Sequence, residues 1–316
     1  MAAHPRVQQF QISGAIQPVA PFDFDKTLGF LDMFTPMRRE QTLEANVLTK
    51  AIMLNGQTYA FQVWSTGTVE APQIDYTLLS DEPISEQAWQ TLENRIRFFL
   101  SMDEDLRPFY AIADTDPHFA PIAHQLYGLH QVKFLTPFEI AAWAILCQRI
   151  PIPVAQKIKQ RLVERYGGSI ELSRFTYWAF PEAERLAAVD GAALEEVVRN
   201  DRKAAYLGGV ARAFASVDED FLLNASTTEV ERWLRAIKGI GEWSTGFILI
   251  RGLGRMDHLP EHEPRLEEAV ERRYGTGHTI SEIADKFGAL KGYWAYYMRT
   301  MGETKREYTS YRDASG

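Results

Sequence analysis

Two helices joined by a four-residue turn constrain this chain more than any other feature. An amphipathic pattern from Thr227 to Ile237 runs directly into Lys238-Gly239-Ile240-Gly241, and a second helical pattern starts at Glu242. Glycine permits so tight a turn because it has no Cβ and adopts positive φ without strain. Ile240, between the two glycines, can fill the gap between the helices. The N–H groups of the turn and the positive end of the second helix then point to one place, which is a geometry that binds phosphate.

The turn alone is also compatible with an ordinary helix C-cap followed by a new helix, and the residues after it favour the first interpretation. Arg251-Gly252 ends the second helical pattern, and a loop containing Asp257 follows. Glu263 lies twenty positions after Trp243 without a gap, directly before Pro264. Because proline is favoured at the first position of a helix, we expect Glu263 at a helix N-cap.

The run from Lys238 to Leu266 resembles the helix-hairpin-helix DNA glycosylase superfamily, specifically the bacterial 3-methyladenine DNA glycosylase II (AlkA) family. The hairpin of that family reads PGIGxWTA, and its catalytic aspartate lies twenty positions after the tryptophan. This chain departs from the pattern in having Lys238 for the proline and Glu263 for the aspartate. The resemblance implies that Glu263 is the catalytic carboxylate, which stabilises an oxocarbenium-like transition state.

Each catalytic assignment has a competing interpretation. An acidic residue at a helix N-cap also compensates the helix dipole, and Glu263 could have that role alone. Asp257 matches a family position that looks structural. Glu261 and His262 are the alternatives if the register of the loop differs.

The resemblance also implies a pocket for a flipped base, which we expect to be lined by Trp243, Phe247, Leu290 and Tyr293. Trp243 stands where bifunctional relatives carry the lysine that forms a Schiff base, so the resemblance implies a monofunctional enzyme. An indole face can stack on an electron-deficient alkylated base. Large aromatic residues at helical spacing also belong to protein cores, which is the competing interpretation for Trp243 and Tyr293.

Further residues are predicted to bind DNA. Ala144-Ile145-Leu146-Cys147-Gln148 resembles the AILGQ phrase of the family, and the next residue, Arg149, stands where relatives wedge a side chain into the duplex. A phosphate contact or a plain surface position would equally explain Arg149. The predicted DNA-binding residues are Lys238, Gly239, Ile240, Gly241, Gln148, Arg149 and Lys203. The resemblance also suggests a monovalent cation on the hairpin backbone.

Composition limits the alternatives. A net charge of −8 and an isoelectric point of about 5.5 argue against a protein that coats DNA by bulk electrostatics. The single cysteine, Cys147, excludes a four-cysteine iron–sulfur cluster. No zinc-site or phosphate-loop motif occurs, so we expect no cofactor. There is no long apolar run and no secretion signal at the N-terminus, which predicts a cytoplasmic protein without a membrane partner.

The pattern along the chain changes after the first hundred residues. Short β-rich runs over 7–12, 44–54 and 59–65, with Asn55-Gly56 as a hairpin signal, alternate with helical patterns over 25–34 and 85–102. From Asp103 onward the chain reads as helices with short turns, beginning with a Thr136-Pro137 helix start. We therefore predict an α+β fold: a small antiparallel-sheet domain at 1–110, an all-α helix-hairpin-helix domain at 111–302 and a frayed tail at 303–316.

The sequence thus predicts a bacterial, monomeric, monofunctional glycosylase that excises alkylated bases such as 3-methyladenine and 7-methylguanine from double-stranded DNA. Two alternatives stay open. One is a glycosylase for oxidised bases such as 8-oxoguanine, against which Trp243 counts. The other is a non-catalytic protein that binds damaged DNA, which the glutamate at the aspartate position motivates.

Overall fold

The computed structural model of the chain describes residues 9–34, 40–260 and 263–301. The predicted frayed tail and the alternative residues Glu261 and His262 lie outside these ranges. Within them, no helix is both long enough and apolar enough to cross a bilayer.

The first part of the chain forms a five-stranded antiparallel sheet in the order β1-β5-β4-β3-β2. Its strands are β1 (Phe10–Ile16), β2 (Gln41–Glu44), β3 (Val47–Leu54), β4 (Gln57–Ser65) and β5 (Ile74–Ser80). The predicted run 44–54 is divided by a turn at Ala45 and Asn46, whose φ angles are 52° and 62°. Neither β5 nor the separate strand β2 was predicted. β5 does alternate apolar with polar residues, but it has only 7 residues, and three of the four residues of β2 are polar.

The Asn55-Gly56 turn was predicted correctly. Both residues have positive φ, at 53° and 78°, as the tight turn between β3 and β4 requires. The two N–H groups of the turn point outward and both donate to the Glu182 carboxylate, to Oε1 and Oε2 respectively, at 2.7 Å each. Glu182 precedes helix α7 (Ala183–Ala187), so this contact connects the sheet to the helical part of the chain.

The prediction of an all-α second part missed a β-hairpin, β6 (Gly168–Leu172) and β7 (Phe175–Ala179). It packs on the sheet through Ile170, Leu172 and Tyr177, against Ala51 and Met53 of β3. The alternate residues of β3, Leu48 and Ile52, face the main core. β3 is therefore covered on both faces. The alternation of Ile170 with Leu172 was a period-two signal, but it spans too few residues to stand out among helices.

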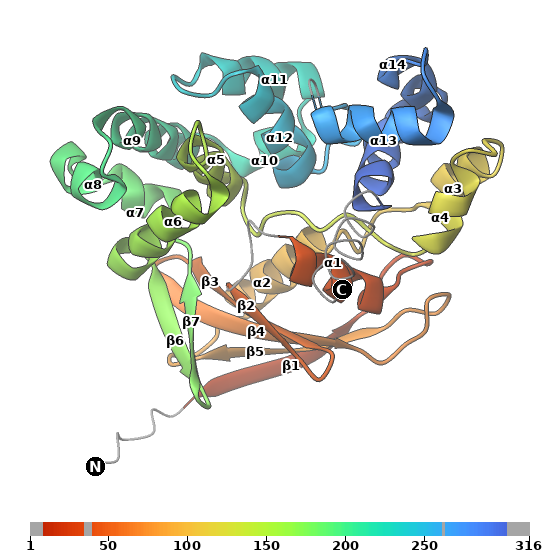
Figure 1. Cartoon of the computed structure of the whole chain (residues 1–316). Coiled ribbons are helices and arrows are strands. Elements are labelled where there is room, and N and C mark those ends of the chain that lie inside the picture. The colour runs from red at the N-terminus through yellow and green to blue at the C-terminus, as the bar shows by residue number, and fades with distance from the viewer. Residues whose placement is uncertain (1–8, 35–39, 261–262, 302–316) are drawn as a thin grey trace, which may run out of the picture.

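Helices form the rest of the fold and, as Figure 1 shows, gather on one side of the sheet. The predicted start of α5 is confirmed, since the Thr136 side chain accepts from the Glu139 N–H and Pro137 follows the cap. The predicted capping box at Thr279 and Glu282 is also present. The helices are α1 (Phe24–Met33), α2 (Glu86–Phe99), α3 (Arg107–Ala113), α4 (Ala120–Gln125), α5 (Pro137–Leu146), α6 (Ile152–Tyr166), α7 (Ala183–Ala187), α8 (Gly191–Val198), α9 (Asp201–Ser216), α10 (Glu219–Asn224), α11 (Thr227–Ala236), α12 (Glu242–Leu253), α13 (Pro264–Tyr274), α14 (Ile280–Ala284), the 3₁₀ helix η2 (Asp285–Leu290) and a last helical stretch over 291–301.

The sheet and the helices share one hydrophobic core. The continuous set of buried residues includes Leu78 of β5, Phe99 of α2, Trp143 of α5 and Trp294 of the last helix. α1 and α2 lie between the sheet and the upper helices in Figure 1. The boundary at residue 110 therefore stays a prediction about sequence pattern, because the hydrophobic core runs across it.

We predict that Glu182→Gln lowers the free energy of unfolding by about 1 kcal/mol, because a neutral amide replaces a carboxylate that accepts two charge-assisted hydrogen bonds. Chemical denaturation measures the change. The control is Glu184→Gln, which removes an exposed carboxylate two residues along the chain. Equal losses in both variants would contradict the role of the turn contact.

Candidate active site and nucleic-acid interface

The hairpin between α11 and α12 has the predicted tight turn, but only one of its glycines needs positive φ. Gly239 has φ 102°, and a Cβ there would lie 2.6 Å from the Tyr206 ring. Gly241 is the N-cap of α12 with φ −99°, and a Cβ there would meet nothing. The positive φ that glycine permits is therefore used at Gly239 and not at Gly241. Ile240 is buried, as the plug of the gap between the helices should be.

The hairpin presents backbone donors at its surface. Among the described residues, neither the Gly239 N–H nor the Gly241 N–H has a hydrogen-bond partner. The first-turn N–H groups of α12 add further donors, since a helix start has no preceding carbonyls to pair with. Lys238 is exposed beside them. This arrangement can bind a phosphate group.

Two predicted DNA-binding side chains instead support the hairpin region from within the protein. The Gln148 Nε2 donates to the Gly239 carbonyl at 2.8 Å, and the Lys203 Nζ donates to the Leu146 carbonyl at the end of α5 at 2.7 Å. Burial lowers the pKa of the Lys203 ammonium. Because the Ile237 and Gly239 carbonyls both accept hydrogen bonds from the protein, a cation on the hairpin backbone stays a prediction.

Arg149 occupies a strained backbone position. Its φ is 54°, in the left-handed region that non-glycine residues rarely adopt, and the residue is exposed just after α5. Such strain persists where the surroundings enforce it, and it often marks functional positions. This conformation changes the direction of the chain after α5 at Arg149, the residue that the sequence predicts to insert into the duplex.

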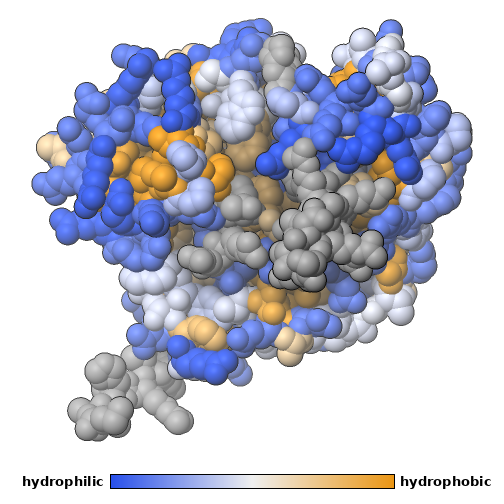
Figure 2. All heavy atoms as spheres, viewed as in Figure 1, coloured by the Kyte–Doolittle hydropathy of each residue, from blue (hydrophilic) through white to orange (hydrophobic). Residues whose placement is uncertain are grey.

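A pocket of about 590 Å³ lies beside the hairpin. It is lined by residues of α1, α5, α12, α13 and the last helix, together with Gln131 and Glu263. Figure 2 shows a recess in the middle of this face, with apolar surface in its depth. The pocket brings Trp243, Phe247 and Glu263 together, as predicted.

Trp243 and Phe247 form a flat stacking surface in this pocket. Their rings are stacked, with centroids 5.2 Å apart and an interplanar angle of 13°. Trp243 is 49% exposed, so it is not the core residue of the competing interpretation. Phe247 is held from behind by Phe134, whose ring meets it edge-on at 6.1 Å. A planar ligand could therefore stack on a preformed aromatic pair.

Glu263 is the N-cap of α13, and its side chain makes no cap hydrogen bond to the helix. The Arg299 Nη1 instead lies 3.2 Å from Glu263 Oε2, so the last helix holds the carboxylate at the pocket wall. The Asp257 side chain accepts from the Thr227 hydroxyl at the start of α11, 2.9 Å away. Asp257 is thus hydrogen-bonded to the start of α11, and its structural role stays a prediction.

Two predicted pocket residues lie elsewhere. The pocket lining includes neither Leu290 nor Tyr293. Tyr293 is fully buried in the core, where its hydroxyl donates to Glu104. It packs inward because the last helix turns other residues, Tyr296 and Arg299, toward the pocket.

The sequence did not indicate the N-terminal wall of the pocket. Phe30 of α1 and Phe34, the C-cap of that helix, line it. With Tyr296 they surround the Arg251 guanidinium at 4.5 to 5.5 Å from the ring centroids. These contacts join segments more than two hundred residues apart, so no local pattern reveals them. The match of Arg251-Gly252 to the family spacing was the one sequence feature that pointed to Arg251.

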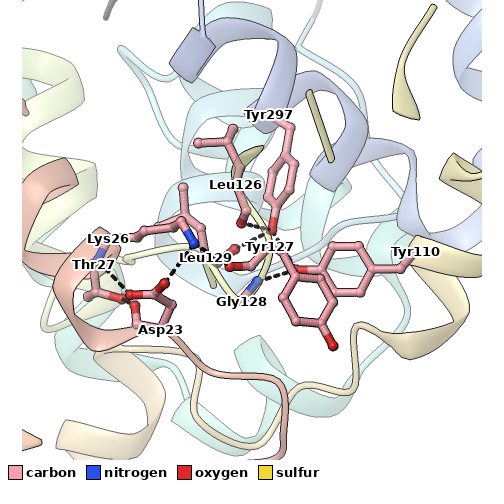
Figure 3. Close-up of polar contacts among 9 residues, drawn as sticks. All are labelled: Asp23, Lys26, Thr27, Tyr110, Leu126, Tyr127, Gly128, Leu129 and Tyr297. Atoms are coloured by element: carbon pink, nitrogen blue, oxygen red, sulfur yellow. Dashed lines mark hydrogen bonds and ion pairs between the residues drawn. The ribbon is translucent and has the colours of Figure 1, made fainter. Parts of the chain in front are cut away.

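A loop over 126–129 holds α1 against the helical part of the chain (Figure 3). Asp23 caps α1 by accepting from the Lys26 N–H at 2.9 Å, and its own N–H donates to the Gly128 carbonyl at 2.8 Å. The Lys26 ammonium donates to both the Asp23 carboxylate, at 2.7 Å, and the Tyr127 carbonyl, at 2.8 Å.

The same loop holds the last helix. Tyr297 donates to the Leu126 and Leu129 carbonyls at 3.0 and 2.7 Å, and Tyr110 lies 2.8 Å from its hydroxyl oxygen. The Gly128 N–H donates to Tyr110 at 2.8 Å. Burial raises the pKa of Tyr297 well above its ordinary value, so the hydroxyl keeps its proton. The two walls of the pocket are therefore fixed to one loop.

A larger cleft of about 880 Å³ lies between the sheet and α5 to α7, and none of the predicted site residues lines it. Its wall contains the buried Lys159, which pairs with Glu139 at 2.7 Å and with Glu40 at 2.5 Å. These charges satisfy one another, which is typical of a structural ion cluster. The smaller pocket at the hairpin is therefore the candidate active site.

Comparisons with known proteins show what the chain is similar to. Residues 142–291 match the model of the HhH-GPD superfamily base excision DNA repair protein. A DNA-3-methyladenine glycosylase from Bacillus subtilis is 28% identical over 287 residues, covering 88% of this chain and 93% of the relative. The solved 3-methyladenine DNA-glycosylase from Archaeoglobus fulgidus has a TM-score of 0.75 at 21% identity and covers 92% of this chain and 98% of its own. An 8-oxoguanine glycosylase/lyase from Clostridium acetobutylicum in complex with double-stranded DNA has a TM-score of 0.67 at 17% identity and covers 96% and 98%.

We predict different consequences for the two hairpin glycines. Gly239→Ala lowers the melting temperature, because a Cβ meets Tyr206 and φ is unfavourable, whereas Gly241→Ala leaves the melting temperature unchanged. Gly239→Ala also weakens binding to damaged and undamaged duplexes alike, because a phosphate contact carries no lesion information. Thermal unfolding and fluorescence anisotropy measure these effects. A loss of affinity confined to damaged DNA would contradict the assignment.

Proposed function

The chain belongs to the helix-hairpin-helix DNA glycosylase superfamily, and from this premise we propose that it excises alkylated bases from double-stranded DNA in base excision repair. The substrates are bases of the 3-methyladenine and 7-methylguanine type. The enzyme acts as a cytoplasmic monomer and leaves the DNA strand intact.

The observation that carries the proposal is one pocket with a stacking surface and a carboxylate in its lining, beside a hairpin with backbone N–H groups that are unpaired among the described residues. Trp243 and Phe247 supply the stacking surface, and Glu263 supplies the carboxylate. A flipped base leaves the base stack of the duplex, so it needs a new surface on which to stack. An alkylated base carries positive charge, which strengthens its attraction to an indole face.

Glu263 acts on the sugar rather than on the base. As the glycosidic bond breaks, positive charge develops on the sugar, and a fixed carboxylate close to that position stabilises it. The Arg299 guanidinium orients the carboxylate through Oε2. Glu263 has one methylene more than the family's aspartate, and its ion pair with the last helix provides the fixation that a longer side chain needs.

Arg149 fits the role of the residue that fills the space left by the flipped nucleotide. It projects from a strained turn directly after α5, and Gln148 beside it holds the hairpin carbonyl. The neighbour of the proposed wedge residue is thus hydrogen-bonded to the hairpin that we propose binds phosphate. A long side chain at this place offsets part of the cost of unstacking the base.

The alternative of an oxidised-base glycosylase/lyase is supported by overall fold alone, through relatives at 17% identity. A lyase needs an amine that attacks the sugar. Trp243 offers none at the start of α12, so the pocket favours simple hydrolysis.

We predict that Glu263→Gln abolishes the release of methylated bases and leaves affinity for DNA with an abasic analogue largely intact. The amide keeps the shape of the side chain but cannot stabilise a cation. Single-turnover release from methylated DNA measures the effect. The control is Glu268→Gln, which removes a carboxylate that lines the same pocket and pairs with Arg272 at 2.8 Å. Unchanged release in Glu263→Gln would redirect the assignment to Asp257 or Glu261.

We further predict that base loss leaves an unbroken strand, which breaks only after hot alkali. Borohydride trapping during the reaction tests this, because it fixes any Schiff base as a covalent protein–DNA band. No band is expected from the wild-type protein. A band that disappears in Lys238→Arg would end the monofunctional assignment and identify Lys238 as the nucleophile.

A further inference from the structure

Gln131 is a fully buried residue of the pocket lining whose side-chain amide is unsatisfied. Its exposed fraction is 0%. Its backbone is paired, since the Ser101 hydroxyl donates to its carbonyl at 2.5 Å and its N–H points to the Tyr293 hydroxyl oxygen at 3.4 Å. Neither the side-chain Oε1 nor the side-chain Nε2 has a hydrogen-bond partner among the described residues.

An amide in this state needs an explanation. Buried polar side-chain atoms are nearly always hydrogen-bonded, and leaving a donor and an acceptor unpaired in the same group costs free energy that an apolar residue would avoid. The amide is nevertheless placed at the wall of a pocket that is large enough for a base. The simplest physical reason is that its partner is the ligand of the pocket.

The chemistry of the amide defines that ligand. A carboxamide presents one donor and one acceptor side by side in a plane, and it pairs with an edge that offers the complementary donor and acceptor. Purine bases have such edges, and glutamine pairs with adenine in this bidentate way. The stacked pair of Trp243 and Phe247 in the same pocket supplies the flat surface that such a ring needs.

We propose that Gln131 recognises the flipped base by hydrogen bonds to the donor–acceptor edge of a purine. This inference rests on the proposed function and adds the group that reads the base. Gln131 is neutral, so it can bind a positively charged alkylated purine without the repulsion that an arginine would bring. Glu263 acts on the sugar, and Gln131 contributes selectivity for the base itself.

The test measures the binding of free bases, which separates recognition from catalysis. The fluorescence of the exposed Trp243 reports titrations with 3-methyladenine and with 1-methylbenzimidazole, a fused ring of similar size without the exocyclic amine and the six-membered-ring nitrogens. We expect the wild-type protein to prefer 3-methyladenine by on the order of tenfold to a hundredfold, the range of a bidentate contact. Gln131→Met, which has a similar length and no such donor or acceptor, should lose this preference and bind 1-methylbenzimidazole as before.

Thermal unfolding provides a second measurement. Gln131→Met should unfold at the same or a higher temperature, because it removes an unsatisfied buried amide. The control, Gln62→Met, removes an amide of β4 that donates to Thr49 at 3.3 Å outside the pocket, and it should leave the base preference unchanged. Gln131→Leu serves as a second variant if the methionine variant does not fold.

The outcomes separate this inference from the proposed function. If Gln131→Met and Gln131→Leu keep the wild-type preference for 3-methyladenine, the inference is overturned, whether or not the protein releases methylated bases. If the preference is lost in these variants, the inference stands, and a wild-type protein that releases no base from methylated DNA would then overturn the proposed function alone.

Discussion

The geometry of the candidate active site depends on the hydrogen bonds that the backbone of one short loop, 126–129, makes to its neighbours. Leu126, Gly128 and Leu129 are buried, and buried backbone groups must find partners. Tyr110 and Tyr297 supply partners from the helical side, and Asp23 and Lys26 supply them from α1. α1 and the last helix, which form two walls of the pocket, are hydrogen-bonded to the same loop. These hydrogen bonds therefore determine the position of α1 relative to the last helix.

A second set of contacts fixes the sheet to α5 and α6. Lys159 of α6 lies in a buried position between Glu139 of α5 and Glu40, which directly precedes β2. Burial opposes ionisation of Glu40, yet the ammonium groups of Lys159 and Lys50 outweigh it and lower the pKa of that carboxyl. Such clusters contribute little net stability, because desolvation offsets most of the attraction, but removing one partner leaves an uncompensated charge. The cluster therefore specifies how the sheet meets the helix that carries Trp143 and ends beside Arg149.

Local sequence patterns were sufficient where a feature depends on neighbouring residues. The Asn55-Gly56 turn, the Thr136 cap and the tight turn at Gly239 follow from backbone chemistry within a few residues, and the structure has all three. The resemblance to a family added the spacing from Trp243 to Glu263, and both residues line the same pocket. Patterns failed where a partner is distant. The β6–β7 hairpin is a strand pair only because Ala51 and Met53 of β3 offer it an apolar face.

The sequence by itself determined the hairpin, the helix that follows it and the placement of a carboxylate at the start of α13, since each rests on residues close together in the chain. Tertiary structure alone decided which side chains complete the pocket. Helical spacing cannot distinguish Tyr293 from Tyr296, yet packing turns the first into the core and the second toward the pocket. Likewise, nothing in the residues around Gln131 indicates an unsatisfied amide. That property belongs to the pocket, which Gln131 lines together with residues of α1, α12 and the last helix.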